Sequence, residues 1–314
     1  MTYSILALDS DTGQVGGAVQ SHFFAVGRRC LTLRPGVGAV GSQAFGSAAH
    51  GPRALDAVAS HGSLPEGIID RLLADDPNRD QRQVLVLDAA GSTAAYTGPG
   101  CLPNARHVAE SGVVAGGNTL LSDELPARMV AAFGTADGPL AVRLLAAMDA
   151  AEEAGGDTRG AMSAALRVVG PDPVEFIQDG TLVDLRVDHA DDPVGELRRL
   201  LGVSDGHGQL VRGVLSPGRL VGVGRDPVEF VDVEELDRSL LRAQEAMGQE
   251  DLEVTFWRGV VALRTGRTGL ARDLLARAIA VRPAFHDLLV GVDAVGRADV
   301  SAELLRSLDP TQPL

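Results

Sequence analysis

The chain has 314 residues, of which 45% are hydrophobic, and a formal net charge of −14. This length allows one large domain and a small one, and the negative charge argues against nucleic acid and anionic membrane surfaces as partners. All 28 basic residues are arginines, which excludes a lysine acting as Schiff base, general base or phosphate-binding residue.

Strands of alternating or largely apolar character dominate the first 100 residues. The first strand begins almost at the start of the chain, where most proteins have a frayed, polar tail. Pro35-Gly36 and the turn at 88–91 each connect two strands as a hairpin. The sequence predicts strands over 2–8, 14–21, 29–33, 37–42, 83–87 and 92–97, a helix that begins near residue 51, and a second helix over 64–73.

Residues 101–201 combine further helices with short strands. A strand over 113–115 ends before Gly116-Gly117-Asn118. Helices are predicted over 122–133, 139–153 and 194–201, and strands over 163–169 and 182–187. Strands, then helices, then strands again indicate two sheets enclosed by helical layers.

The chain after residue 201 is predicted to form a second, smaller domain. Residues 202–228 are Gly-rich and are predicted to be a linker, whereas residues 229–314 have a helical pattern. Five residues have the spacing of a tetratricopeptide helix pair over 252–285, and a generic helical hairpin explains them equally well: Gly259, Gly266, Ala271, Ala278 and Pro283. One such pair cannot bury its own apolar face, so helices over 234–247 and 286–306 are expected to cover it.

The two cysteines, Cys30 and Cys101, are too few for a disulfide framework or a cysteine-rich zinc site. The sequence shows no signal-peptide pattern, and no apolar run reaches the length of a membrane span. Closely spaced histidine pairs are also missing. We therefore expect a cytoplasmic protein without a membrane span, a metal ion or a cofactor.

Thr2 is the strongest candidate for a catalytic residue. Methionine is normally removed before a small residue such as threonine, and its removal would give Thr2 both a hydroxyl and a free α-amine. An α-amine has a pKa of about 7.7–8.0, so part of it is neutral at neutral pH and can accept the hydroxyl proton. A rigid inner strand over 2–8 would hold such a terminus in place. The alternative is that Thr2 only begins an edge strand.

Two further clusters carry groups that suit the same chemistry. The side-chain amide of Asn118 and the backbone N–H of Gly117 can form an oxyanion hole, and the alternative is an ordinary turn. Asp157, Arg159 and Ser163 combine an acid, a cation and a hydroxyl at a turn that enters a strand. Asp157 can hold the α-ammonium group, and Arg159 can bind Asp157 or a substrate carboxylate. The alternative for this cluster is a capping turn with a surface ion pair.

Over about residues 1–201 the chain resembles the family called domain of unknown function 1028. The stretches that carry the resemblance are, in chain order, MTYSILALD, AVQSHFFAVG, SQAFG, HGPRAL, RQVLVLD, YTGPGC, GGNTL, GGDTRGAMSAAL and LVDLRVDHADDPVGELRRLL. That family is placed among the N-terminal-nucleophile (Ntn) hydrolases, so the resemblance implies a four-layer αββα sandwich and Thr2 as nucleophile. The stretch D-x-R-G-x-x-S at 157–163 is also similar to the late Asp and Ser element of proteasome subunits. The chain departs from the proteasome pattern because it has no lysine beside the threonine.

The sequence therefore predicts an α+β protein with an αββα domain over 1–201 and a tetratricopeptide-like helical domain over 229–314. The predicted activity is hydrolysis of an amide-type C–N bond in a small polar or anionic substrate, without a cofactor. The alternative is an inactive binding or scaffold protein whose residues 229–314 contact a protein partner, and a homo-oligomer is compatible with both. The catalytic candidates are Thr2, Asn118, Asp157 and Ser163, and the substrate-binding candidates are Ser21, His22, Gln43, Gly117 and Arg159.

Overall fold

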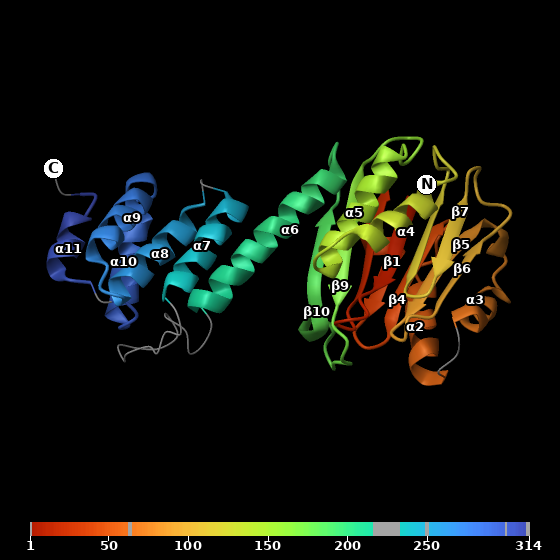
Figure 1. Cartoon of the computed structure of the whole chain (residues 1–314), viewed down its shortest axis with the longest axis horizontal. Helices are drawn as coiled ribbons and strands as arrows, with labels where there is room; N and C mark the ends of the chain where they lie inside the picture. The colour runs from red at the N-terminus through yellow and green to blue at the C-terminus, as the bar shows by residue number, and fades with distance from the viewer. Residues whose placement is uncertain (1, 62–64, 216–232, 249–250, 299, 312–314) are drawn as a thin grey trace. The chain divides into compact units, whose positions relative to one another are not determined.

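The computed structural model describes residues 2–61, 65–215, 233–248, 251–298 and 300–311 (Figure 1). The chain divides into two compact units, Met1–Arg198 and Arg199–Leu314. The division falls within one helix, α6 (Pro193–Leu210). Each unit has its own buried core and is described by itself.

Two antiparallel sheets form the centre of the first unit. The six-stranded sheet has the order β10 (Thr181–Val187), β9 (Ser163–Val169), β2 (Val15–Ser21), β1 (Thr2–Leu8), β8 (Val113–Asn118) and β7 (Arg106–Glu110). The four-stranded sheet has the order β3 (Leu31–Arg34), β4 (Gly38–Ala44), β5 (Arg82–Asp88) and β6 (Thr93–Thr97). The prediction of a protein that mixes helices and strands is confirmed, and the strands of both sheets pair antiparallel.

The two sheets face each other, and helices cover their outer faces (Figure 1). Helices α4 (Leu125–Thr135) and α5 (Leu140–Glu153) pack on the six-stranded sheet, whereas α2 (His50–His61) and α3 (Pro65–Leu73) pack on the four-stranded sheet. Strand β5 shows how the sequence directs this arrangement. Its side chains alternate, so that Leu85 and Leu87 join the core between the sheets while Val84 and Val86 join the core beneath α2 and α3.

Strand β1 lies inside the six-stranded sheet, paired with β2 on one side and β8 on the other. Its first six residues are all buried. Hydrogen bonds to two neighbours and burial on both faces fix the backbone at Thr2. The predicted strand over 2–8 is confirmed, and it is an inner strand.

The first unit departs from the predicted elements at three places. Residues expected to begin a strand at 29 form one helical turn, α1 (Gly27–Cys30), and the strand starts at Leu31. Strand β7 is not among the predicted strands. Four of its five residues are exposed, so its sequence shows no apolar alternation that would indicate a strand. Strand β8 continues through Gly116-Gly117-Asn118 instead of ending before it. Glycine is suited to position 117 because a Cβ there would lie 2.6 Å from the Leu120 side chain.

The predicted linker over 202–228 is wrong for its first part, because residues 202–210 continue helix α6 and residues 211–215 form a π-helical turn. Packing overrides the low helix propensity of glycine here. Leu210 and Val214 are buried in the core of the second unit. Gly206 allows α6 to approach α7 (Val233–Met247) closely, because the Ala243 carbonyl oxygen lies 3.0 Å from where a Cβ would be. The remainder of that linker, residues 216–228, lies outside the described residues.

The second unit is helical, as predicted. Its further helices are α7 (Val233–Met247), α8 (Leu252–Arg264), α9 (Thr268–Val281), α10 (Ala284–Ala294) and α11 (Ala302–Ser307). Helices α8 and α9 form a hairpin, and they pack closely at Gly259, where a Cβ would lie 2.7 Å from Leu275. The single helix expected over 286–306 is divided, because Gly296 adopts a left-handed backbone with φ 73° after α10.

Across the described ranges, no helix combines the length and the apolar character needed to cross a membrane. The same residues include no group of three or more His, Cys, Asp or Glu side chains placed to hold a metal ion.

Candidate functional site

Four of the predicted site residues form a row across the six-stranded sheet. Thr2 is opposite Asn118 on β8, and Ser21 on β2 is opposite Ser163 on β9. Tyr3 pairs with Gln20, so Thr2 and Ser21 are also neighbours, and the Thr2 hydroxyl donates to the Ser21 hydroxyl at 3.1 Å. Residues opposite each other in an antiparallel sheet project to the same face. One end of the sheet therefore collects an amide and three hydroxyls.

Thr2 contributes to a cavity of about 330 Å³. Its exposed fraction is only 6%, so its hydroxyl is held in the wall of this cavity rather than on an open surface. Of the nine predicted site residues, Thr2 and Gln43 line the cavity. The full lining is Thr2, Phe23, Val26, Arg29, Cys30, Ser42, Gln43, Ala44, Phe45, Gly46, Ala48 and Arg82.

Asn118 is buried, and both hydrogens of its side-chain amide are used. One is donated to the Thr2 carbonyl oxygen at 3.3 Å and the other to Oε1 of Gln83 at 3.1 Å. An oxyanion role for Asn118 therefore requires one of these bonds to be exchanged for the substrate oxygen. Gly117, its predicted companion, lies within β8, and its carbonyl accepts a hydrogen bond from the Gln83 amide at 2.9 Å.

Asp157 joins two loops at the edge of this row. One carboxylate oxygen accepts from the backbone N–H of His22 at 3.0 Å, and the other from the backbone N–H of Arg159 at 2.8 Å. The Arg159 guanidinium also forms an ion pair with this carboxylate at 3.3 Å. These contacts fix the loop after β2 to the loop before β9. Among the described residues, the buried Nδ1 of His22 has no hydrogen-bond partner.

Ser163 is fully buried and positions the same loop after β2. Its hydroxyl donates to the carbonyl oxygen of Phe23 and accepts from the backbone N–H of Val26 at 3.0 Å. Phe23 and Val26 both line the cavity. Ser163 therefore shapes the cavity wall through the backbone.

The side chains of Gln43 and Gln83 link the two sheets close to Thr2. The Gln43 amide oxygen accepts from Ser4 at 2.8 Å, and its nitrogen donates to Gln83 at 2.8 Å and to the Gly116 carbonyl at 3.0 Å. Both glutamine side chains are buried. Gln83 is a further site residue that was not among the predicted ones, although a large polar side chain at the start of a buried, apolar strand is a signal for such a residue.

Backbone strain collects at the ends of the strands that carry the site. Ala25, Ala44 and Thr119 follow or end β2, β4 and β8 and have φ of 55°, 62° and 53°. Residues other than glycine rarely adopt this left-handed conformation, and a β-branched threonine does so least easily. Strained backbone is retained where the surrounding structure determines it, which is often at functional sites.

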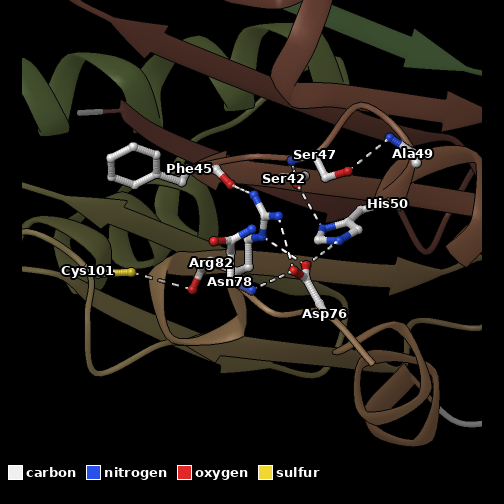
Figure 2. A network of polar contacts seen from close by, with 9 residues as sticks. All are labelled: Ser42, Phe45, Ser47, Ala49, His50, Asp76, Asn78, Arg82 and Cys101. Carbon is white, nitrogen blue, oxygen red and sulfur yellow. Dashed lines mark hydrogen bonds and ion pairs between the residues drawn. The ribbon is translucent and has the colours of Figure 1, made fainter. Parts of the chain in front are cut away.

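A second polar network, shown in Figure 2, lies next to the cavity. Oγ of Ser42 lies 3.3 Å from Nδ1 of His50, and Nε2 of His50 lies 3.2 Å from the Asp76 carboxylate. Arg82 donates to Asp76 through Nε at 2.9 Å and Nη2 at 3.2 Å, and its remaining terminal nitrogen donates to the Phe45 carbonyl. Ser42 and Arg82 both line the Thr2 cavity. No motif or spacing in the sequence predicts this network.

The charges in this network follow from its geometry. The hydrogen bonds from Arg82 lower the pKa of Asp76 to about 2, so this carboxylate is ionised and accepts hydrogen bonds. Burial, and then the nearby Arg82 charge, lower the pKa of His50, which is therefore neutral at neutral pH. Since Asp76 can only accept, Nε2 of His50 carries the hydrogen and Nδ1 accepts from the Ser42 hydroxyl.

Comparisons with known proteins identify the first unit. A family of unknown function (DUF1028) matches residues 2–197. Protein SPO2555 from Silicibacter pomeroyi, described as DUF1028, is 33% identical, with a TM-score of 0.58 over 68% of this chain and 90% of that chain. Anbu (ancestral beta-subunit) from Yersinia bercovieri is 11% identical, with a TM-score of 0.31 over 68% of this chain and 98% of that chain. No curated protein matches. The chain belongs to the DUF1028 family, whose function is unknown.

Proposed function

We propose that this chain is an N-terminal-nucleophile hydrolase that cleaves an amide-type C–N bond in a small substrate, with Thr2 as nucleophile after removal of Met1. The observation that carries the proposal is the position of Thr2, whose hydroxyl is fixed on an inner strand in the wall of a cavity. The order of helices, sheet, sheet and helices in the first unit also suits the αββα sandwich of Ntn hydrolases.

The proposed reaction uses the two groups of Thr2. Oγ1 attacks the amide carbon while its proton passes to the neutral α-amine. The C–N bond then breaks, the leaving amine takes the proton from the α-ammonium group, and an acyl ester remains on Oγ1. A water molecule, activated by the same amine, attacks this ester and releases the carboxylic acid.

The neighbours of Thr2 have supporting roles in this proposal. Pairing of β1 with β2 and β8 supplies a rigid backbone, and the Ser21 hydroxyl orients Oγ1. Asp157 and Ser163 hold the loop that forms one wall of the cavity. Asn118 stabilises the oxyanion by exchanging its bond to the Thr2 carbonyl or to Gln83 for one to the substrate.

The decisive experiment begins with the mass of the purified, untagged protein, which is expected to be that of a chain starting at Thr2. A panel of amides, lactams, ureido and formyl compounds is then tested with the wild type and with Thr2→Ala. Turnover by the wild type that Thr2→Ala lacks supports the proposal. A retained Met1, or equal turnover by both proteins, would overturn it.

A binding or scaffold protein is the second candidate, and a feature of the second unit favours it. Helices α8 and α10 and the turn between α9 and α10 line a cavity of about 340 Å³, which includes Trp257 and Phe285. Val281, Leu288 and Val290 nearby along the chain are exposed. Under this proposal the tetratricopeptide-like unit binds a protein partner, and a purified chain that retains Met1 while binding through residues 229–314 would support it.

A further inference from the structure

We propose that Arg29 is an anion-binding residue and that the substrate of the Thr2 cavity carries a carboxylate together with an apolar, ring-sized group. This inference rests on the proposed function for the location of the reacting bond. It deepens that function by naming the substrate class, and it is tested by binding alone.

The charge of the cavity wall points to an anion. Within the described part of the chain, the lining contains two arginines, Arg29 and Arg82, and no aspartate or glutamate. Such a cavity repels cationic groups and attracts carboxylates, even though the whole chain has a net charge of −14. The local charge is therefore opposite to that of the protein as a whole.

The two arginines differ in how far their charge is already paired within the described residues. The Arg82 guanidinium binds Asp76 with two nitrogens and the Phe45 carbonyl with the third (Figure 2). Arg29 is exposed, and the central carbon (Cζ) of its guanidinium lies over the Phe23 ring, 5.7 Å from the ring centroid. Among the described residues no carboxylate lies within ion-pair distance of Arg29. Of the two partners that the sequence suggests for Arg159, Asp157 or a substrate carboxylate, the structure shows the ion pair with Asp157.

The apolar part of the substrate is indicated by two aromatic side chains. Phe23 and Phe45 both line the cavity and are 49% and 57% exposed, although only 4% of the chain is aromatic. Their backbones are fixed, because the Phe23 carbonyl accepts from Ser163 and the Phe45 carbonyl accepts from Arg82. Exposed rings on a fixed backbone form a wall that a ligand can cover at a small entropic cost.

The size of the cavity limits the ligand. A volume of about 330 Å³ is at the lower end of the range for small-molecule sites. It suits an acyl or amino-acid fragment better than a folded peptide segment. A carboxylate on Arg29 and a ring against Phe23 or Phe45 would leave the rest of the ligand extending toward Thr2.

The test compares 4-phenylbutanoate with 4-phenylbutanamide, which have the same ring and chain but differ in charge at pH 7. Dissociation constants are measured by ligand-observed NMR for the wild type, Arg29→Gln and Arg28→Gln. Arg28 is the matched control because it is the adjacent, exposed arginine and does not line the cavity. Since one charge-assisted contact is at stake, the wild type and Arg28→Gln are expected to prefer the carboxylate by about tenfold. Arg29→Gln is expected to lose that preference, and high salt is expected to reduce it in the other two.

Three results would overturn the inference: no binding of either compound, equal binding of both by the wild type, or the same loss in Arg28→Gln as in Arg29→Gln. Repeating the titration with Thr2→Ala separates this inference from the proposed function. If the wild type hydrolyses no amide and the carboxylate preference persists in Thr2→Ala, the anion-binding site is supported and the proposed hydrolase activity is refuted. If turnover depends on Thr2 but does not change in Arg29→Gln, the hydrolase activity is supported and the anion-binding role of Arg29 is refuted.

Discussion

Thr2 and Asn118 lie directly opposite each other on neighbouring antiparallel strands, and the Asn118 amide donates a hydrogen bond to the Thr2 carbonyl oxygen. The same amide donates to Gln83, which belongs to the other sheet. Asn118 thus fixes the backbone of the candidate nucleophile and connects it to the second sheet, whether or not it also contacts a substrate.

Replacing Asn118 by alanine is therefore expected to lower stability as well as activity. The substitution leaves buried acceptors on Thr2 and Gln83 with one donor fewer, which costs about 1–3 kcal/mol of the free energy of unfolding. Urea denaturation of Asn118→Ala measures this loss, with the exposed Asn78→Ala as the control expected to change little. A fully stable Asn118→Ala would show that the amide does not support the fold.

The hydroxyl and the amine of Thr2 can be removed separately. Thr2→Ala removes the hydroxyl, and an uncleavable N-terminal tag blocks the amine while leaving every side chain in place. Each is expected to reduce turnover by about 10³-fold or more, because nucleophile and base act as a unit. Thr2→Ser is expected to retain part of the activity, since it keeps both groups. The exposed Thr135→Ala is the matched control, and a tagged protein with full activity would rule out the amine as base.

The sequence predicts those parts of the fold and site that depend on local patterns. Alternating or apolar runs locate β1, β2 and β5, and the pairing of neighbouring strands then brings Thr2 beside Ser21. The network of Ser42, His50, Asp76 and Arg82 has no such pattern. Its members come from a strand, a helix start, a loop and another strand, and only the packing of α2 and α3 on the sheet brings them together. Helix α6 likewise exceeds its expected length because tertiary contacts outweigh glycine propensity.

The neutral state of buried His50 predicts a loss of stability in mild acid. Its pKa is lowered in the folded protein, so below about pH 6.5 the unfolded chain binds more protons than the folded one. The stability supplied by neutral His50 is complete above that pH and decreases as the pH falls. We expect His50→Gln to show a smaller decrease in the free energy of unfolding between neutral pH and pH 5.5 than the wild type. Exposed His189→Gln is expected to behave like the wild type, and parallel curves for all three would contradict this prediction.

The Asp76–Arg82 pair predicts a second, more acidic transition. The pKa of Asp76 is lowered from 3.8 to about 2, so its stabilisation is complete above pH 3.8 and is lost as the pH falls toward 2. This shift corresponds to about 2 kcal/mol at neutral pH. Asp76→Asn is expected to be less stable by at least that amount at pH 7, with a difference from the wild type that shrinks below pH 4. The neighbouring, exposed Asp75→Asn serves as control, and a constant difference down to pH 2 would refute the assignment.

Two glycines in the second unit give opposite predictions for the same substitution. A Cβ at Gly259 would lie 2.7 Å from Cγ of Leu275, a fully buried side chain, so Gly259→Ala forces α8 and α9 apart. Overpacking of this kind costs about 1–3 kcal/mol. At Gly291, within α10, a Cβ would have no atom within 4 Å, so Gly291→Ala is expected to stabilise its helix by about 0.5–1 kcal/mol. Thermal unfolding monitored by the fluorescence of the single Trp257, a residue of α8, reports on this unit. A lower transition temperature for Gly259→Ala and an equal or higher one for Gly291→Ala are expected, and a Gly259→Ala protein as stable as the wild type would show that the two helices are not in close contact at this glycine.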